Sequence, residues 1–433
     1  MLEEFTGKRI TIMGLGRFGG GLGVARWLAG RGGRLTVTDL ADRQALAGPL
    51  TELADLIDSG TVTLHLGGHE RADFTGCDLV IANPAVPRPW ENEYLQAARS
   101  AGVPITTEIR LLIERLDRRR VIGVTGTAGK STTAAMIHHA LSRAGRRSHL
   151  GGNIGGSLLE HLGEIRPADW VVLELSSAML YWLGAGIGSE TAEGFSPRVA
   201  VLTNIAPNHI DWHGCLEHYE QSKANIFAFQ QPGDRRIVGD ECTDPPAPIP
   251  LKIPGRHNQR NAVMALAAVQ RAAGPGPHEA AGLLADFSGL PHRLQLVAEH
   301  AGMRFYDDSK ATTPTATVLA VDSFEHPDRV HLIAGGYDKR IDLTSIADLA
   351  GELAGLYTIG ATGRALADAA GGTPKAVYCQ TLDRAVALAI ERMGPDDILL
   401  LSPGCASWDQ FENYEQRGAA FAEAVQWLLA PTT

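Results

Sequence analysis

The sequence predicts an α/β protein built from three domains, and three observations lead to this expectation. Strand-like and helix-like segments alternate along the chain, which is typical of sheets whose strands are joined by helices. Two glycine-rich turns each stand between such a strand and such a helix. The alternation starts again near residue 120 and after Pro291, and 433 residues exceed what one hydrophobic core usually holds. We therefore expect domains over 1–106, 107–290 and 291–433.

The first domain begins with a strand–helix–strand pattern. The segments 9–13, 35–38 and 79–82 are rich in Ile, Leu, Val and Thr, which favour strands, and a helical stretch over 21–28 lies between the first two. Such a βαβ unit belongs to a parallel sheet, so we expect a Rossmann-like domain.

The second and third domains show the same alternation. The apolar run 121–124, a glycine-rich turn and the helical run 132–141 predict a central P-loop ATPase-like domain with a parallel sheet. The proline-rich stretch 245–250 is expected to be a loop or a sheet edge, and an Ala-rich helix is expected over 261–273. The third domain is expected to be Rossmann-like. The further expected strands of both domains are 170–175, 198–202, 304–306, 330–333, 357–359 and 398–401.

The bulk composition is that of a globular protein, with 44% apolar and 20% charged residues. The formal net charge of −10 argues against nucleic acid or an anionic membrane as the main partner, because both attract basic surfaces. No apolar run approaches the ~18 residues of a membrane span, and the acidic N-terminus is unlike a signal peptide. The five cysteines form no C-x-x-C pair. We expect a cytoplasmic monomer with reduced thiols.

The first glycine-rich turn, Gly14-Leu15-Gly16-Arg17-Phe18-Gly19, follows a predicted strand and precedes a predicted helix. Glycines let the backbone approach a diphosphate, and a helix N-terminus supplies N–H groups and a positive dipole. Asp39 ends the next predicted strand, where an acidic residue suits a ribose hydroxyl. The alternative is a turn that merely packs closely. The pattern indicates a nucleotide diphosphate more firmly than it indicates NAD.

The second glycine-rich turn runs from Gly123 to Thr132 and ends in Gly129-Lys130-Ser131. Backbone N–H groups of such a loop hold phosphate oxygens, Lys130 would reach the β- and γ-phosphates, and Ser131 would hold Mg²⁺. Val124 stands where a strict Walker loop has glycine, so this is a variant of the phosphate loop.

Together the two loops narrow the function. A dehydrogenase explains the first loop alone, and a simple kinase or ATPase explains the second alone. An ATP-driven enzyme that acts on a nucleotide-linked substrate explains both.

At this point the chain resembles the Mur ligase family, over nearly its whole length. Residues 125–132 resemble the family's ATP loop, with Ala128 where Asn is usual, and Gly126, Thr127, Gly129 and Thr132 in the matching places. The resemblance implies an ATP-dependent enzyme that joins an amino acid to a UDP-linked substrate through an acyl phosphate.

The resemblance also implies a metal site. Glu174 matches the family's Mg²⁺-binding glutamate. His209, in a T-N-I-A-P-N-H-I-D segment with Asn208 where Asp is common, would hold a second Mg²⁺. Lys223 matches a lysine that is carbamylated in the family, and a carbamate is an oxygen ligand that suits Mg²⁺. Standing alone, these would be a solvated glutamate, a structural histidine and a surface lysine.

Further ATP contacts are implied by the second half of the chain. Asn258 and Asn261 match the segment at the nucleotide base, although Asn258 alone would be read as a helix cap. Arg293 resembles an arginine that contacts the ATP phosphates. In Asp307-Asp308-Ser309-Lys310, the resemblance assigns Asp308 to the ribose and Lys310 to the transferring phosphate.

The third domain resembles the member of the family that adds D-glutamate. Lys339 in Gly335-Gly336-Tyr337-Asp338-Lys339 and Ser407 in the segment 401–411 would bind the glutamate side chain. Thr312 would also contact the incoming amino acid, and Tyr414 stands where Phe is usual. The handedness of the glutamate stays open.

The implied substrates are ATP, glutamate and UDP-N-acetylmuramoyl-L-alanine. The UDP-linked substrate would meet Gly14, Leu15, Gly16, Arg17, Phe18, Asp39, Asn83 and Asn153. Three alternatives remain: another amino-acid ligase of the family, including a folylpolyglutamate synthase; an NAD(P)-binding oxidoreductase or sensor; and a relative that binds UDP-sugar without catalysis.

Overall fold

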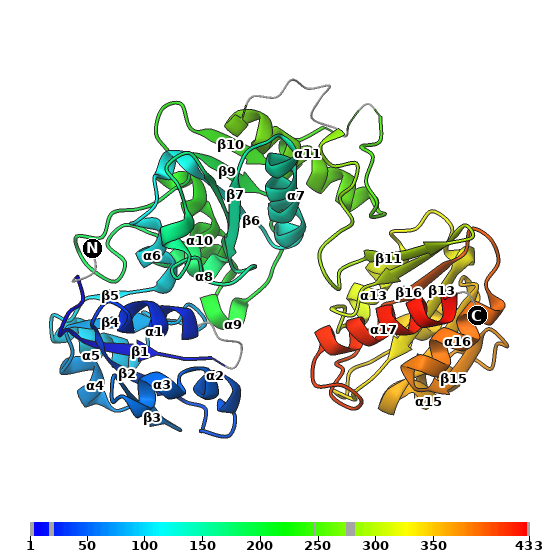
Figure 1. Ribbon diagram of the computed structural model, residues 1–433, viewed down its shortest axis with the longest axis horizontal. Coiled ribbons are helices and arrows are strands. Elements are labelled where there is room, and N and C mark those ends of the chain that lie inside the picture. Colours follow the sequence, from blue (N-terminus) through cyan, green and yellow to red (C-terminus); the bar gives the residue numbers. More distant parts are fainter. Residues whose placement is uncertain (1–3, 17–20, 244, 246, 274–281, 431–433) are drawn as a thin grey trace. The chain divides into compact units, whose positions relative to one another are not determined.

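The computed structural model describes residues 4–16, 21–243, 245, 247–273 and 282–430. By their internal contacts these residues form two compact units, one of residues 1–244 with 261–283 and one of residues 245–260 with 284–433. The first unit contains two sheets and the second contains one sheet (Figure 1). The sequence therefore predicted the fold class correctly, whereas the domain boundaries at 106 and 290 stay predictions.

The N-terminal sheet has the order β3-β2-β1-β4-β5, and its strands are parallel. Apolar strand residues such as Ile10 and Val37 face a core formed with α1, and Val80 belongs to a second cluster formed with α5. The elements are β1 (Arg9–Met13), α1 (Leu22–Ala29), β2 (Arg34–Asp39), α2 (Ala47–Glu52), α3 (Ala54–Asp58), β3 (Val62–Leu66), α4 (Arg71–Thr75), β4 (Leu79–Ala82), α5 (Glu93–Ser100), β5 (Ile105–Thr106) and α6 (Glu108–Ile113).

The central sheet has the order β10-β9-β6-β8-β7 and is also parallel. Its middle strands β6 and β8 are buried at every position, as expected for a sheet covered on both faces. Figure 1 shows α7 and α10 on opposite sides of it. The elements are β6 (Val121–Thr125), α7 (Lys130–Arg143), β7 (Ser148–Gly152), β8 (Trp170–Glu174), α8 (Ser177–Trp182), β9 (Val199–Leu202), α9 (Ile210–His213), α10 (Leu216–Ala228), β10 (Arg235–Val238) and α11 (Arg256–Ala273).

The third sheet has the order β11-β12-β16-β13-β14-β15, and only β11 pairs antiparallel with its neighbour. One core cluster joins the sheet to α13, α14 and α15, and another joins it to α16 and α17. The elements are β11 (Gln295–His300), β12 (Met303–Asp307), α13 (Pro314–Val321), β13 (Val330–Gly335), α14 (Thr344–Asp348), β14 (Gly355–Ile359), α15 (Gly360–Ala369), β15 (Ala376–Gln380), α16 (Leu382–Arg392), β16 (Ile398–Leu401) and α17 (Tyr414–Leu429).

One helix differs from its expected position. The Ala-rich helix was expected from residue 261 and begins at Arg256. Asn258 therefore lies inside the first turn of α11, and its side-chain amide donates to the carbonyl of Pro254 at 2.6 Å, so the alternative interpretation of Asn258 as a helix cap was wrong. None of the described helices is long and apolar enough to cross a membrane.

Candidate functional site

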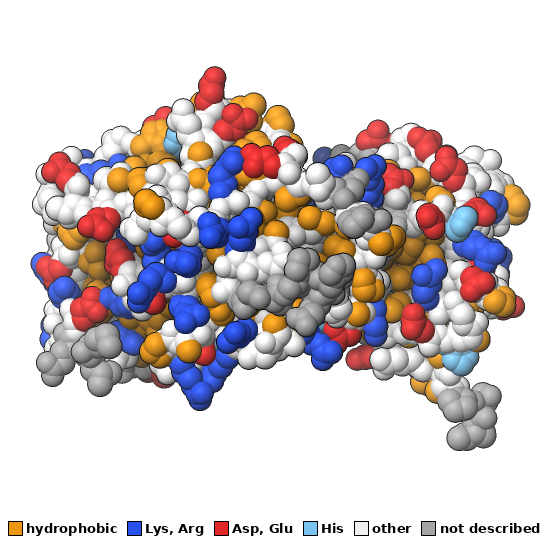
Figure 2. All heavy atoms as spheres, turned by 90° about the horizontal axis from the view of Figure 1, so that it is seen from above, with side chains coloured by type: hydrophobic (Ala, Val, Ile, Leu, Met, Phe, Trp, Pro, Cys, Tyr) orange, Lys and Arg blue, Asp and Glu red, His pale blue; other side chains and the backbone are white. Residues whose placement is uncertain are grey.

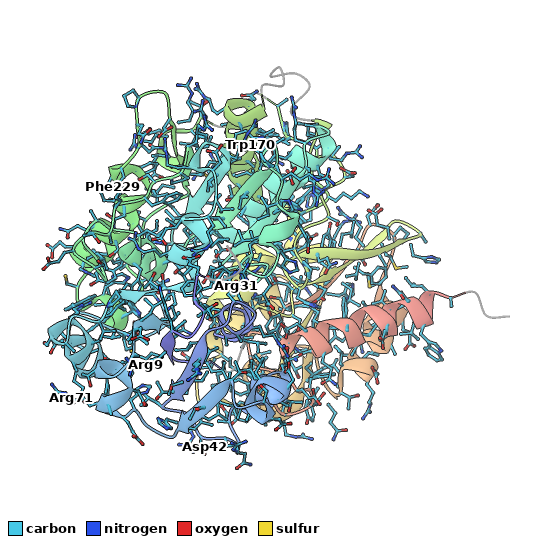
Figure 3. All side chains as sticks on the ribbon, turned by 60° about the vertical axis from the view of Figure 1, so that its left-hand side comes forward. Arg9, Arg31, Asp42, Arg71, Trp170 and Phe229 are labelled. Carbon is cyan, nitrogen blue, oxygen red and sulfur yellow. The ribbon has the colours of Figure 1, made fainter. Side chains whose placement is uncertain are left out.

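The site residues of the central domain lie at the carboxyl ends of three neighbouring strands, β9, β6 and β8. The phosphate loop follows β6, Glu174 ends β8, and the segment from Thr203 to His209 follows β9. Trp170, labelled in Figure 3, begins β8 and marks the opposite end of the sheet. Loops at the carboxyl ends of neighbouring parallel strands meet at one edge, which is where open α/β sheets bind ligands.

Two glycines allow the phosphate loop to pack tightly. Gly126 has φ +149° and Gly129 has φ +79°, and a Cβ at either position would overlap a side-chain oxygen, of Thr203 and of Asn261 respectively. Asn261 is buried, so it packs directly beneath the turn that opens α7. The loop therefore requires both glycines, and Asn261 packs against it, whereas its expected contact with the nucleotide base stays a prediction.

The expected phosphate-binding side chains begin α7. Lys130 is the first residue of the helix, and Ser131 and Thr132 lie in its first turn. Lys130 Nζ donates to the carbonyl of Thr127 at 3.0 Å. The ammonium group thus folds over the loop whose backbone N–H groups would hold the phosphates.

In the proposed metal site, the carboxylate of Glu174 fits a divalent cation. Glu174 is 1% exposed, and its Oε2 is buried without a hydrogen-bond partner among the described residues. Its Oε1 accepts from the amide of Asn153 at 2.8 Å. An orphaned carboxylate oxygen in a buried site is costly unless a cation or water satisfies it. Lys223, on α10, is 2% exposed and donates to the carbonyl of Gly126 at 2.7 Å.

Burial, together with the nearby Lys130 ammonium, lowers the pKa of Lys223 to about 7, against the opposing effect of the Glu174 carboxylate. A lysine with such a pKa is partly neutral near pH 7, which is the condition for its amine to react with CO₂. Lys223 is therefore not the surface lysine of the alternative interpretation.

Tyr219 lies between Lys223 and His209, and the sequence interpretation did not single it out. The Lys223 ammonium is 4.7 Å from the centre of the Tyr219 ring, and the His209 ring is 6.4 Å from it. The Tyr219 hydroxyl is 2.8 Å from Thr127 Oγ1 in the phosphate loop. Tyr219 precedes Lys223 by one helical turn, so helical spacing alone would have identified it. His209 itself is exposed and has φ +52°.

The N-terminal domain gathers its expected residues in the same way, at the ends of neighbouring strands β2, β1 and β4. Asp39 accepts from the N–H of Gly16 at 3.1 Å, and the Asn83 amide donates to the carbonyl of Gly14 at 3.1 Å. Leu15 is fully buried, so only its backbone can meet a ligand. Arg17 and Phe18 lie outside the described residues.

The loop that contains Asn153 contacts Glu174, the carboxylate at the end of β8. Gly152 ends β7 with φ +94°, and the N–H of Asn153 donates to the carbonyl of Glu174 at 2.9 Å. With its side-chain bond to the same glutamate, Asn153 holds Glu174 in place.

In the third domain, the expected residues follow the neighbouring strands β12, β16 and β13. Asp308 is 8% exposed, accepts from the N–H of Leu294 at 3.1 Å, and accepts from the Ser402 hydroxyl at 2.8 Å. Burial raises the pKa of Asp308 to about 7, against the opposing effect of these hydrogen bonds and of Arg293. Arg293 is exposed, and its positive charge opposes the rise in the pKa of both Asp308 and Tyr414.

Two lysines of this domain lie against aromatic rings. Lys310 Nζ is 5.0 Å from the centre of the Tyr414 ring, and Lys339 Nζ is 5.1 Å from the centre of the Trp408 ring. Ser407 is buried at 3% exposure next to Trp408, and Thr312 is half-buried before α13. The aromatic rings hold both ammonium groups near the loops that the resemblance assigns to phosphate and glutamate.

Arg417 was missed by the sequence interpretation. This guanidinium is 1% exposed and donates to the hydroxyl and carbonyl of Ser309 at 2.9 and 2.8 Å and to the carbonyl of Cys405 at 3.1 Å. It therefore joins the loop of Lys310 to the loop of Ser407. No local signal distinguishes a buried arginine from a surface one on an amphipathic helix.

A cavity of about 220 Å³ lies elsewhere in the central domain. Arg120, Asp169 and Val171 contribute to its lining, at the amino ends of β6 and β8. It is thus at the opposite end of these strands from the phosphate loop.

Family models match the chain in three segments. Residues 8–107 match the Mur ligase MurD-like N-terminal domain, residues 124–244 the Mur ligase middle domain, and residues 292–405 the Mur ligase glutamate ligase domain.

Curated relatives match almost the full length. A UDP-N-acetylmuramoylalanine–D-glutamate ligase of Anaeromyxobacter dehalogenans is 36% identical over 471 residues, covering 96% of this chain and 97% of the relative. The ligase of the same name from Geobacter metallireducens is 36% identical over 469 residues, covering 98% of each chain. That of Acidobacterium capsulatum is 34% identical over 469 residues, covering 98% of this chain and 97% of the relative.

Solved structures resemble the fold. A UDP-N-acetylmuramate–alanine ligase of Thermotoga maritima has a TM-score of 0.55 at 18% identity and covers 97% of this chain and 100% of its own. A UDP-N-acetylmuramoyl-L-alanyl-D-glutamate–2,6-diaminopimelate ligase has a TM-score of 0.54 at 16% identity and covers 98% and 93%. Because family models cover all three domains and curated relatives align along nearly the whole sequence, this chain belongs to the Mur ligase family.

Proposed function

We propose that this chain is the ATP-dependent ligase that joins glutamate to UDP-N-acetylmuramoyl-L-alanine in peptidoglycan precursor synthesis. The observation that carries the proposal is the edge of the central sheet, where the phosphate loop meets a buried Glu174 and a buried Lys223. The names of the full-length relatives supply both the D-glutamate and the UDP-linked acceptor.

The reaction needs ATP because a carboxylate is a poor electrophile. The terminal carboxylate of the UDP-linked substrate attacks the γ-phosphorus of ATP, ADP leaves, and an acyl phosphate forms. The amine of glutamate then adds to the acyl carbon, loses a proton and expels phosphate. Lys130, which already lies over the phosphate loop, would stabilise the charge on the transferring group, and Lys310 would do so from the third domain.

Two anions must approach each other in the first step, and a divalent cation would neutralise their charges. Glu174, His209, Ser131 and a carbamylated Lys223 would hold Mg²⁺ at two sites; the orphaned Oε2 of Glu174 supports this assignment. Carbamylation can be checked by NMR after labelling with ¹³C-bicarbonate. A carbamate signal that persists in Lys223→Ala would contradict its assignment to this residue.

The amino acid would be held by Lys339, Ser407, Thr312 and the region of Tyr414. The names of the curated relatives, which are D-glutamate ligases, support a preference for D-glutamate. The UDP end would meet Gly14, Gly16, Asp39 and Asn83, which the N-terminal sheet brings together.

Phosphate release from ATP tests the proposal directly. The purified chain is supplied with UDP-N-acetylmuramoyl-L-alanine and Mg²⁺, and then with D-glutamate, L-glutamate or no amino acid. We expect release that depends on D-glutamate and that falls by at least about 100-fold in Lys130→Ala, because one preorganised charge is worth a few kcal/mol in the transition state. Release that depends on L-glutamate would keep the ligase activity and change the proposed substrate from D-glutamate to L-glutamate. If no phosphate is released with any amino acid, the proposed ligase function is wrong.

A further inference from the structure

Three polar side chains of the central domain form a continuous hydrogen-bonded chain, which we call the Ser–His–His chain. Ser177 Oγ is 2.9 Å from Nε2 of His213, and Nδ1 of His213 is 2.8 Å from Nδ1 of His218. Ser177 is 4% exposed and His213 is 2% exposed. The central histidine therefore uses both ring nitrogens inside the protein.

Each member of the Ser–His–His chain lies on a segment that carries one proposed metal ligand. The serine begins α8, directly after the loop that follows Glu174 at the end of β8. The central histidine ends α9, whose N-cap is His209. The outer histidine lies in the first half of α10, which carries Lys223. The Ser–His–His chain thus links all three segments through the imidazole ring of His213.

The segment of His209 depends on this link more than the other two. The helix α9 has only four residues, and a helix this short has little stability of its own. His209 before its start is exposed and Gly214 after its end has no side chain, so burial fixes α9 only through residues between them. The buried anchors of α9 are Trp212 and His213.

The contact between two imidazole nitrogens also limits the charge of the Ser–His–His chain. One Nδ1 must donate and the other must accept, so at most one of the two carries a hydrogen there. Burial lowers the pKa of His213 to about 4, helped by His218, His209 and Lys223, while Asp211 opposes this. A neutral imidazole places no additional positive charge beside the proposed cation site.

We propose that His213 is a positioning residue that sets the relative placement of Glu174, His209 and Lys223. It does not touch the substrates; it acts by holding α8, α9 and α10 together, as residues behind metal ligands do in other proteins. The identification of the three ligands rests on the proposed function, whereas the hydrogen-bonded chain is a property of the fold.

Metal affinity tests this inference with a readout that does not require turnover. His213→Phe keeps a ring of similar size and removes both hydrogen bonds. We expect Mn²⁺ to bind at least about 10-fold more weakly to this variant in the presence of a non-hydrolysable ATP analogue, as measured by electron paramagnetic resonance, because loss of such a partner usually costs 10- to 100-fold. In turnover assays the Mg²⁺ concentration for half-maximal rate should rise by a similar factor, with the KM for glutamate little changed.

His138→Phe is the matched control. His138 is a half-buried histidine on α7 of the same domain, and its Nδ1 lies 2.8 Å from the Ser148 hydroxyl. This variant should lose a comparable His–Ser hydrogen bond without a change in Mn²⁺ affinity. If His213→Phe binds Mn²⁺ as the wild type does, or if the control weakens binding equally, the inference is overturned.

Ser177→Ala carries the test if His213→Phe does not fold. It removes one hydrogen bond of the chain and almost no volume, and we expect a smaller loss of Mn²⁺ affinity in the same direction. Unchanged affinity in a folded Ser177→Ala would equally contradict the inference. A wild-type protein that binds Mn²⁺ but releases no phosphate with any amino acid would overturn the proposed function alone.

Discussion

Lys223 and Asp308 are both enclosed by the protein, and burial moves their pKa values towards neutrality from opposite sides. Each of the two values is about 7, because desolvation penalises the charged form of either group. Both residues occupy places where the resemblance expects contact with the metal or with ATP. Ionisable groups whose pKa values are strongly shifted by burial are typical of functional sites and not of an ordinary hydrophobic core.

The variant Asp308→Asn should reveal the free-energy cost of burying the Asp308 carboxylate. The folded pKa is about 7 and the ordinary value is 3.8, so between these values the unfolded chain releases a proton that the folded chain keeps. This residue therefore makes wild-type stability fall as pH rises through that window. The asparagine cannot ionise, and we expect its stability relative to the wild type to increase from about pH 4 to about pH 8 while activity drops.

Thermal unfolding of both proteins across this pH range measures the effect. Curves for Asp308→Asn and wild type that stay parallel would show that the carboxyl group is not desolvated in solution. A loss of ATP affinity in the variant would agree with its proposed contact with the ribose.

At the scale of elements, the phosphate loop is held by the segment that follows β9. Asn204 Oδ1 accepts from the N–H of Ala128 at 3.0 Å, and its amide donates to the carbonyl of the same residue at 3.0 Å. Its backbone carbonyl accepts from Thr127 at 2.9 Å. The Asn204 side chain thus pairs with both backbone polar groups of Ala128, the position where the resemblance leads us to expect Asn.

Asn204→Ala should loosen the loop and weaken ATP binding. Two side-chain hydrogen bonds of about 1 kcal/mol each are lost, and we expect the KM for ATP to rise about 10-fold or more. The control is Asn92→Ala, because Asn92 also accepts two backbone N–H groups, at the start of α5. That variant should lose about 1 kcal/mol of stability without a change in KM. Equal KM values for Asn204→Ala and wild type would contradict the role.

At the scale of the whole molecule, the first unit joins two sheets through buried polar contacts. The Arg110 guanidinium, 4% exposed, donates to the carbonyls of Trp182, Gly184 and Glu193. Trp212 donates from its ring nitrogen to the carbonyl of Pro84 at 3.1 Å. The bond of Trp212 links the N-terminal and central domains next to Asn83, and the proposed UDP and metal sites belong to the same compact unit.

The surface agrees with the charge balance of the sequence. On the face drawn in Figure 2, basic side chains gather over one part of the surface, and acidic and apolar side chains surround them. Although the formal net charge is −10, the chain offers small anionic substrates local positive groups such as Lys130.

Much of the fold could be predicted because the sequence patterns that indicate its strands are local. The expected strands at 9–13, 79–82 and 398–401 match β1, β4 and β16 in full, since apolar β-branched runs between turns are a local property. The strands β3, β5, β7, β10, β11 and β15 were missed. All six are edge strands of their sheets, and their structure depends more on pairing with a neighbouring strand than on their composition.

The sequence by itself determined the fold class, the two phosphate-type loops and the identity of the candidate residues, because glycine spacing and motif order are written along the chain. Only the tertiary structure decided that Glu174 keeps an orphaned oxygen, that Lys223 is enclosed, and that Arg417 and His213 bridge distant segments. Burial and the hydrogen bonds that accompany it arise when residues far apart in sequence pack together. No local sequence pattern predicts which polar groups will be desolvated when these residues pack together.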